Sequence, residues 1–356
     1  MKRNIYLSIL AAVILFGCHK ASTPSGATDF NSLEQTVIND FTNDVALAQY
    51  SSLTNAAVAL NGAITTLNSD ATDSNLHAAQ TAWKNIRHVW EQCEGFLIGP
   101  VEAYDYDPNT DTWPTDYTQM DSLLASENAL QLSDIQMLPQ SLRGYHPIEY
   151  IIFGENGTRT ASELDARKKQ YLISLAGDIL YNNVQPLYQS WTSAPVNFAQ
   201  QVMNAGNGST EYASKLAFFL DVTGDNGMAG ICNEVGSEKM KDPYDAKNPA
   251  LCESPYSGNT LSDFRDNIIG LQNVYLGLNG GNGLKDLVAS KNKSLDNQIQ
   301  AQITAAINSF ANITEPYEKA IIDQRVQVQQ TMTQLETLKD LLENDLTDFL
   351  KTNVKD

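Results

Sequence analysis

The sequence predicts an all-α protein built from two four-helix-bundle-like domains related by a loose internal duplication. Apolar residues recur at intervals of three and four along most of the chain, which is the spacing of one helix face. No segment shows sustained alternation of apolar and polar residues, so no strand is predicted. The roughly 325 residues after the N-terminal segment exceed what one core usually holds, which favours two packed bundles over 29–192 and 193–356.

Residues 1–18 are typical of a lipoprotein signal peptide. Two basic residues precede an apolar run over 5–16 that is too short to span a bilayer. The sequence Leu-Phe-Gly-Cys ending at Cys18 resembles a lipobox, whose cysteine receives the lipid; an ordinary cleaved signal with an incidental cysteine is the alternative. Residues 19–28 should form a flexible tether. We therefore expect a lipid anchor in a bacterial cell envelope, on the periplasmic or outer-membrane face.

Acidic residues outnumber basic ones, 42 to 23, and the formal net charge is −19. This balance argues against nucleic acid as a partner and is compatible with cation ligands. After Cys18, three cysteines remain, so at most one bridge can form within the chain. We expect Cys232 and Cys252 to pair in an oxidising compartment and Cys93 to be a buried thiol. Without a CxxC motif, a thiolate metal site is not indicated.

Two long helices are predicted at the start of the first domain. Apolar residues from Leu33 to Leu67 mark the first, with a break expected near Ser51-Ser52. The second begins at residue 74 or 75 and ends between 95 and 100. One face of it mixes indoles and charges: Trp83, Arg87, Trp90 or Glu91, and Glu94. This face is either a surface Arg87–Glu91 pair between packed indoles or a polar seam facing a functional site.

Residues 101–117 are predicted to form a loop rich in acidic residues. Alternating side chains in it are similar to those of a calcium-binding loop: Asp105, Asp107, Asn109 and Asp111, with Asp116 at the twelfth place. Thr110 stands where the sharp turn needs glycine, and an aspartate replaces the bidentate glutamate. A solvated acidic loop is therefore the favoured interpretation.

The stretch Arg143–Gly154 is the most informative part of the chain. Pro147 suits a first helical position, which puts His146 at the N-cap of a short apolar helix. His146 and Glu149, three residues apart, can then share a face and converge on one ligand. The same spacing also fits a capping box, in which Glu149 only returns to the cap, or an anion site at the helix start.

Helical spacing continues to the C-terminus. A helix over 163–191 should kink or nearly end at Pro186. The second domain shows an irregular segment over 241–259 and helices over 212–220, 228–240, 261–276, 295–310 and 335–349. Aligning Gly277 with Gly154 puts Ile269 opposite His146, so only the first half carries the polar pair.

Two motifs together resemble the imelysin family, which is grouped with insulin-cleaving membrane proteases and iron-regulated proteins of bacteria and cyanobacteria. Gly144–Glu149 matches its GxHxxE signature. The segment Glu253-Ser-Pro-Tyr-Ser257, leading through Asp263 into 270–277, is similar to a second family segment, with Tyr256 in place of a phenylalanine. The early helix with Trp83 fits more loosely. The resemblance implies two helical bundles with a site between them around His146 and Glu149.

The resemblance also implies a metal-related function but leaves the chemistry open. Because neither HExxH nor GxSxG occurs, it is uncertain whether the protein is an enzyme. We expect an envelope lipoprotein for iron uptake that binds a metal ion or small iron-containing ligand, with iron preferred over zinc or calcium and iron-transport proteins as further partners. A metallopeptidase and a non-catalytic interaction protein are the alternatives. The expected ligands are His146, Glu149, Glu94 and Glu253, supported by Arg87, Trp83, Ser254, Ser257 and Asp263.

Overall fold

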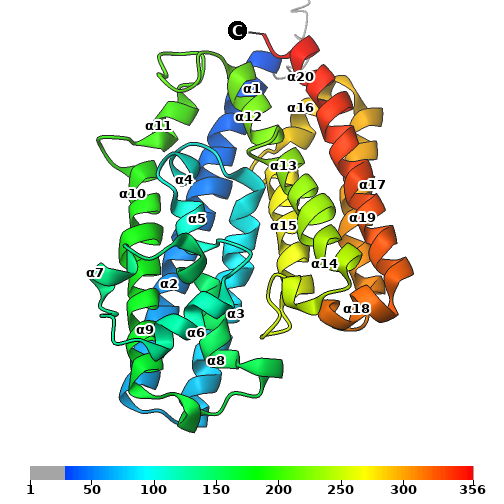
Figure 1. Cartoon of the computed structure of the whole chain (residues 1–356). Coiled ribbons are helices and arrows are strands. Elements are labelled where there is room, and N and C mark those ends of the chain that lie inside the picture. The colour runs from blue at the N-terminus through cyan, green and yellow to red at the C-terminus, as the bar shows by residue number, and fades with distance from the viewer. Residues whose placement is uncertain (1–28, 356) are drawn as a thin grey trace, which may run out of the picture.

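The computed structural model describes residues 29–355, and every regular element in that range is helical, which confirms the all-α prediction (Figure 1). The predicted signal peptide, the lipidation site at Cys18 and the tether over 19–28 lie outside the described residues. No helix between residues 29 and 355 has both the length and the apolar character needed to cross a bilayer.

The first long helix is continuous from residue 30 to residue 69. It consists of α1 (Phe30–Asp40), a π-helical segment (Phe41–Ala46) and α2 (Leu47–Ser69). The break expected near Ser51-Ser52 is wrong, because the Ser52 hydroxyl donates to the Ala48 carbonyl and the helix accommodates it. After a short turn, Thr72 caps α3 (Asp73–Cys93) by accepting from the Asn75 N–H, and α3 packs along α2.

Another continuous helix packs along α2. It runs through α9 (Ala166–Gly177), a π-helical segment (Asp178–Val184) and α10 (Gln185–Thr192). Pro186 does not end it. The proline lies in the first turn of α10, just after the π segment has changed the hydrogen-bond register, so its missing N–H is tolerated.

The segment 101–117, predicted as a loop, contains three short helices or parts of them. These are α4 (Pro100–Ala103), α5 (Tyr106–Thr110) and the start of α6 (Tyr117–Ala125). Two further α-helices, α7 (Leu132–Ile135) and α8 (Tyr145–Phe153), follow before α9, and α8 packs against α3. The first half thus surrounds α3 with short elements on one side and α2 on the other.

Most helices of the second half form a group drawn light green to red in Figure 1, whereas α11, drawn green, lies beside α10. α15 packs directly along α3, and buried apolar residues from both halves form one core cluster. The division at 192/193 and the internal duplication stay predictions. The elements after residue 192 are α11 (Phe198–Met203), α12 (Lys215–Thr223), α13 (Met228–Asn233), α14 (Lys241–Ala246), α15 (Thr260–Leu276), α16 (Leu284–Lys291), α17 (Lys293–Ser309), α18 (Tyr317–Asp323), α19 (Arg325–Asp340) and α20 (Thr347–Asn353).

The three described cysteines are all free and buried, so the expected Cys232–Cys252 bridge is wrong. Their surroundings give the reason. Cys232 lies on α13 near Lys339 of α19, whereas Cys252 lies after a 3₁₀ turn near Glu318 of α18. The prediction that Cys93 is a buried thiol is confirmed.

Candidate functional site

α8 begins two residues earlier than predicted, which changes the position of His146. Gly144 is its N-cap, so His146 is the second helical residue and the expected histidine cap is wrong. Gly144 has φ 79°, and a Cβ there would lie 2.0 Å from the carbonyl oxygen of Thr110. Glycine thus lets two chain segments touch, and the contact brings Asp111 beside His146.

Glu149 binds a distant loop instead of closing a capping box. Its Oε1 accepts from the backbone N–H of Tyr256 at 3.1 Å, and from the N–H and hydroxyl of Ser257 at 2.7 Å each. The capping-box alternative is therefore wrong. Oε2 of Glu149 lies 3.7 Å from Nδ1 of His146, so the two motif side chains do face each other.

His146 is fully buried between carboxylates. Its Nε2 lies 3.1 Å from Oδ1 of Asp111 and 4.0 Å from Oε1 of Glu253. Among the described residues, neither ring nitrogen has a hydrogen-bond partner of good geometry, and Oε2 of both Glu149 and Glu253 is likewise unpartnered. Such unfilled positions on buried polar atoms call for an explanation, and a bound ion is one.

Arg87 is the central cation of a cluster of buried charged side chains around His146. Its guanidinium pairs with Glu91 and Asp111, and it lies 3.0 Å from Oε1 of Glu253 and 3.7 Å from Oδ1 of Asp263. The Arg87 side chain has no exposed surface, so the alternative of a surface Arg87–Glu91 pair is wrong, and the polar side chains of this face are buried.

Aromatic side chains enclose this cation. The guanidinium carbon lies 5.4 Å from the ring centre of Tyr145 and 5.9 Å from that of Trp83. The indole N–H of Trp83 donates to the Tyr145 carbonyl at 2.9 Å, and that of Trp90 donates to Asp111 at 2.7 Å. The indoles thereby fix α8 and Asp111 against α3, and they exclude water from the charges.

Glu94 and Glu91 form the other end of the cluster. The amide of Asn267 donates to a carboxylate oxygen of each at 2.6 Å, and Trp90 donates to Glu94 at 2.9 Å. Lys239 lies 3.6 Å from Glu94 and 3.2 Å from Glu253. The structure therefore brings Glu94 and Glu253 close to one buried cation that the sequence did not single out.

The remaining supporting residues lie behind Arg87. Ser254 donates its hydroxyl to Asp263 at 2.6 Å, and Asn259 donates to the other oxygen of Asp263 at 2.6 Å. Ser257 holds Glu149, as described. All the predicted site residues within the described range thus lie in or directly around one buried cluster.

The cluster contains more acid than base. Burial by itself lowers the pKa of His146, but Asp111 and Glu149 outweigh it and raise that pKa to about 9. Burial raises the pKa of Asp111, yet Arg87 and His146 outweigh it and hold that pKa well below its usual range. The buried carboxylates are Glu91, Glu94, Asp111, Glu149, Glu253 and Asp263, six against the three basic groups Arg87, His146 and Lys239.

The excess acid requires protons or another cation. Burial raises the pKa of Glu91 and of Glu94 well above the usual range. It also raises the pKa of Asp263 to about 6, although Arg87 opposes the shift. Glu91 and Glu94 therefore tend to hold protons at neutral pH, and a metal ion could take the place of those protons.

Two triplets of side chains have ligand atoms within 4.8 Å of one another. One comprises Asp111, His146 and Glu253; the other comprises Glu91, Glu94 and Asp111. Carboxylate oxygens with one imidazole nitrogen suit iron, manganese or zinc. Together with the unpartnered oxygens and ring nitrogens, this donor set fits a metal ion.

Sequence reasoning missed Asp111, Lys239 and Asn267 as members of the cluster. Asp111 was placed in a solvated loop, yet it is buried and shared by both triplets. The sequence feature that could have indicated Asp111 is the run of alternating acidic residues before the stretch Arg143–Gly154. Asn267 stands four residues after Asp263, one helix turn along the same face. Lys239 had no local signal in the sequence.

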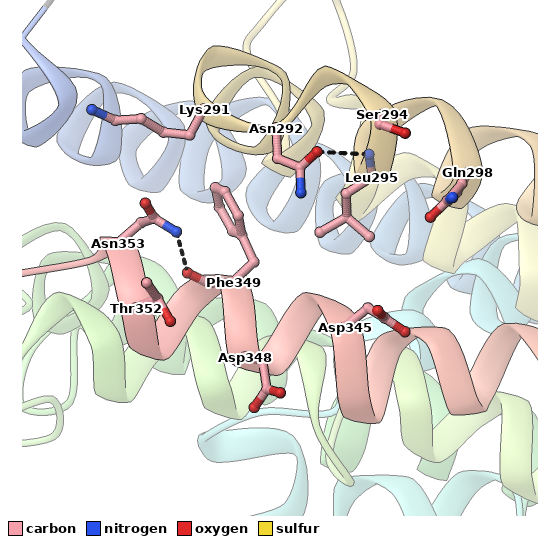
Figure 2. A pocket seen from close by; sticks show the side chains of 10 residues that line it. All are labelled: Lys291, Asn292, Ser294, Leu295, Gln298, Asp345, Asp348, Phe349, Thr352 and Asn353. Atoms are coloured by element: carbon pink, nitrogen blue, oxygen red, sulfur yellow. Dashed lines mark hydrogen bonds between the residues drawn. The ribbon is translucent and has the colours of Figure 1, made fainter.

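A separate surface groove lies away from this cluster. It has a volume of about 580 Å³, and Figure 2 shows Lys291, the last residue of α16, and Asn292 after it across from Phe349 of α20. Asp345 and Asp348 are its acidic residues, and no histidine or cysteine lines it. A smaller cavity of about 510 Å³ includes Glu94 in its wall and so borders the cluster.

Known proteins share this fold and much of the sequence. The profile of the family described as Imelysin matches residues 46–344. Iron-regulated protein A of Synechococcus elongatus is 29% identical over 351 residues, covering 96% of this chain and 94% of its own. A crystal structure of a Parabacteroides distasonis protein, described as an iron-regulated protein A precursor, is 25% identical with a TM-score of 0.81, covering 93% of this chain and 97% of its own.

A more distant structure agrees in fold. An imelysin-like protein from Psychrobacter arcticum is 14% identical with a TM-score of 0.72, and the match covers 89% of this chain and 95% of that one. The profile spans most of the chain, including α3, α8 and α15 that carry the buried cluster. The chain therefore belongs to the imelysin family, as its two motifs predicted.

Proposed function

We propose that this protein binds a metal ion at the buried cluster, with Asp111, His146 and Glu253 as the principal ligands. The observation that carries the proposal is the convergence of these three side chains, with ligand atoms within 4.8 Å of one another, inside a cluster with excess acid. In this arrangement Glu149 acts on the far nitrogen of His146 and orients the ring, as carboxylates behind metal-bound histidines commonly do.

Iron is the metal we propose first. Two relatives are named as iron-regulated proteins, and the oxygen-rich donor set with one imidazole suits iron. Zinc is the next choice because it accepts the same donors, and calcium is less suited because it prefers six or more oxygens. A role in iron uptake at the cell envelope, with the chain anchored through Cys18 and acting beside iron-transport proteins, is the physiological context that we propose.

A peptidase is less favoured by the geometry. A peptide bond would have to reach the metal, whereas Asp111, His146 and Glu253 are all buried and enclosed by Arg87 and aromatic rings. Binding a single ion needs only a path for that ion. A small iron-containing ligand needs a wider path than the described packing offers at His146.

The test is metal loading of the purified protein. After incubation with Fe²⁺ under anaerobic conditions, or with Zn²⁺ or Ca²⁺, gel filtration and elemental analysis should find about one equivalent of the preferred metal. His146→Ala, Asp111→Asn and Glu253→Gln should each lose it. His77→Ala, which removes an exposed histidine at the start of α3, is the matched control and should bind as the unmodified chain does.

Equal metal content in His146→Ala and in the unmodified protein would refute the ligand assignment. Chelator-sensitive cleavage of a peptide, abolished by the same substitutions, would favour the peptidase instead. Metal at 100 times its dissociation constant should also raise the free energy of unfolding by about 2.7 kcal/mol, which thermal denaturation can detect.

A further inference from the structure

The cavity that borders the cluster is strongly acidic. The acidic residues that line it are Glu94, Asp225, Glu234, Glu238 and Glu343, which we call the acidic mouth, and among the described residues no lysine or arginine lines it. Glu94 is 3% exposed and belongs to the buried cluster, whereas Glu234 has a side chain 38% exposed. The acidic mouth therefore extends from Glu234, which is partly exposed to solvent, to Glu94 of the buried cluster.

Lys239 lies where the acidic mouth meets the cluster. Its Nζ is 2.9 Å from Oε1 of Glu234 on the outer side, and 3.2 Å from Oε1 of Glu253 on the inner side. Lys239 is only 5% exposed. Its ammonium is therefore held by ion pairs on both sides, between the acidic mouth and the buried cluster.

The local backbone explains how this lysine reaches both partners. Glu234–Lys239 is a π-helical segment between α13 and α14, and in an α-helix residues five apart would not face each other. The wider turn places Glu234 and Lys239 on one side, so their side chains pair. Single π turns of this kind occur frequently at functional sites.

Glu253, which Lys239 contacts, has one carboxylate oxygen without a hydrogen-bond partner among the described residues. That oxygen, Oε2, is buried, whereas Oε1 contacts Lys239 and Arg87. A divalent cation at Glu253 would lie close to the Lys239 ammonium and repel it. Glu234 offers the ammonium a second partner, nearer to solvent.

We propose that the acidic mouth is the route by which a metal cation enters, and that Lys239 is a resident counter-ion which the metal displaces from Glu253 toward Glu234. This inference rests on the metal site proposed above. The acids of the mouth raise the local cation concentration and speed entry. Lys239 compensates the buried acids while the metal is absent, and it sets the affinity for the metal by competing for Glu253.

The first test changes the charge of the mouth without touching the cluster. Glu238→Gln combined with Glu343→Gln should slow Fe²⁺ or Zn²⁺ association about threefold or more in stopped-flow measurements at low salt. The dissociation rate should change little, and added salt should reduce the difference. The control is Glu127→Gln with Asp323→Asn, two exposed acids that do not line the mouth, which should leave the association rate unchanged.

The second test removes the competing charge. Lys239→Met should tighten metal binding about tenfold or more, because no ammonium has to leave Glu253. Lys239→Arg keeps the charge and should not tighten it. Far-ultraviolet circular dichroism establishes that each variant is folded; if Lys239→Met does not fold, Lys239→Gln, which also removes the charge, takes its place in the comparison with Lys239→Arg.

The two proposals fail in different ways. If the unmodified protein binds none of the tested metals, the proposed metal site is wrong. If it binds metal but the metal associates with the mouth variants as fast as with the control pair, the proposed entry route through the acidic mouth is wrong. If it binds metal and Lys239→Met binds no more tightly than Lys239→Arg, then Lys239 is a structural ion-pair partner and not a displaceable counter-ion.

Discussion

Gly270→Ala should destabilise the protein, because α15 crosses the end of α3 at this residue with backbone against backbone. A Cβ at position 270 would lie 2.3 Å from the carbonyl oxygen of Gln92, and a Cβ at Gly95, across the contact, would lie 2.6 Å from the backbone of Gly270. The neighbours are backbone atoms, so the overlap is relieved only if one helix moves. Asn267, one turn earlier on α15, would move with it.

The magnitude follows from two opposing effects. Alanine in place of glycine favours a helix by about 1 kcal/mol. Inserting a methyl group into a packed contact typically costs about 1–3 kcal/mol, and separations this short from backbone atoms belong at the upper end. The difference is a net loss of about 2 kcal/mol in the free energy of unfolding.

Urea denaturation followed by circular dichroism measures this loss. The matched control is Gly62→Ala on α2, where a Cβ would meet nothing within 4 Å and should stabilise the helix by about 0.5–1 kcal/mol. The two substitutions are chemically identical and should shift the urea midpoint in opposite directions. If both stabilise the protein, α3 and α15 are not in backbone contact at Gly270, and the reasoning is refuted.

Three further predictions concern charged and polar contacts. Arg87→Met should cost about 3–5 kcal/mol in a urea titration, because it leaves buried carboxylates without their cation; an unchanged midpoint would contradict this. Ser257→Ala should cost about 1–2 kcal/mol in the same assay by removing one of three hydrogen bonds to Glu149, and a gain in stability would count against it. A hydrogen bond to Asp266 raises the pKa of His88 above 6.5, so the stability it contributes is full below that pH and is lost as the pH rises through the raised value. The stability difference between the unmodified protein and His88→Gln should therefore be larger at about pH 5 than at about pH 8.5, and a difference independent of pH would refute the pairing.

The helices were predictable because each one carries its apolar stripe locally. The stripe from Leu33 to Leu67 required a helix regardless of the rest of the chain, and the structure contains one. The misplaced break near Ser51-Ser52 reflects a limit of local reasoning. A serine hydroxyl that bonds back to the preceding turn leaves the helix intact, and nothing in the sequence distinguishes that case beforehand.

The site was predictable in part, because His146 and Glu149 lie on one short helix and Arg87 shares a face with Glu94. Asp111 was not, since its burial depends on Gly144 touching the backbone of Thr110 across more than one element. Lys239 depends on a π segment, and the sequence has no reliable signal for one. Long-range contacts thus decided which charged residues became buried.

The composition of the buried cluster constrains what it can be for. Breaking a buried ion pair is costly, yet replacing such a pair with apolar side chains is often neutral or stabilising, so burial of charge is weak support for a purely structural role. Here six carboxylates face three basic groups, which is more acid than ion pairing alone needs. Trp83, Trp90 and Tyr145 exclude water around them, which strengthens the attraction for any cation that enters. A centre with excess acid, unfilled ligand positions and an acidic mouth at one side is suited to taking up a cation, and its stability in the absence of that cation depends on Arg87 and Lys239.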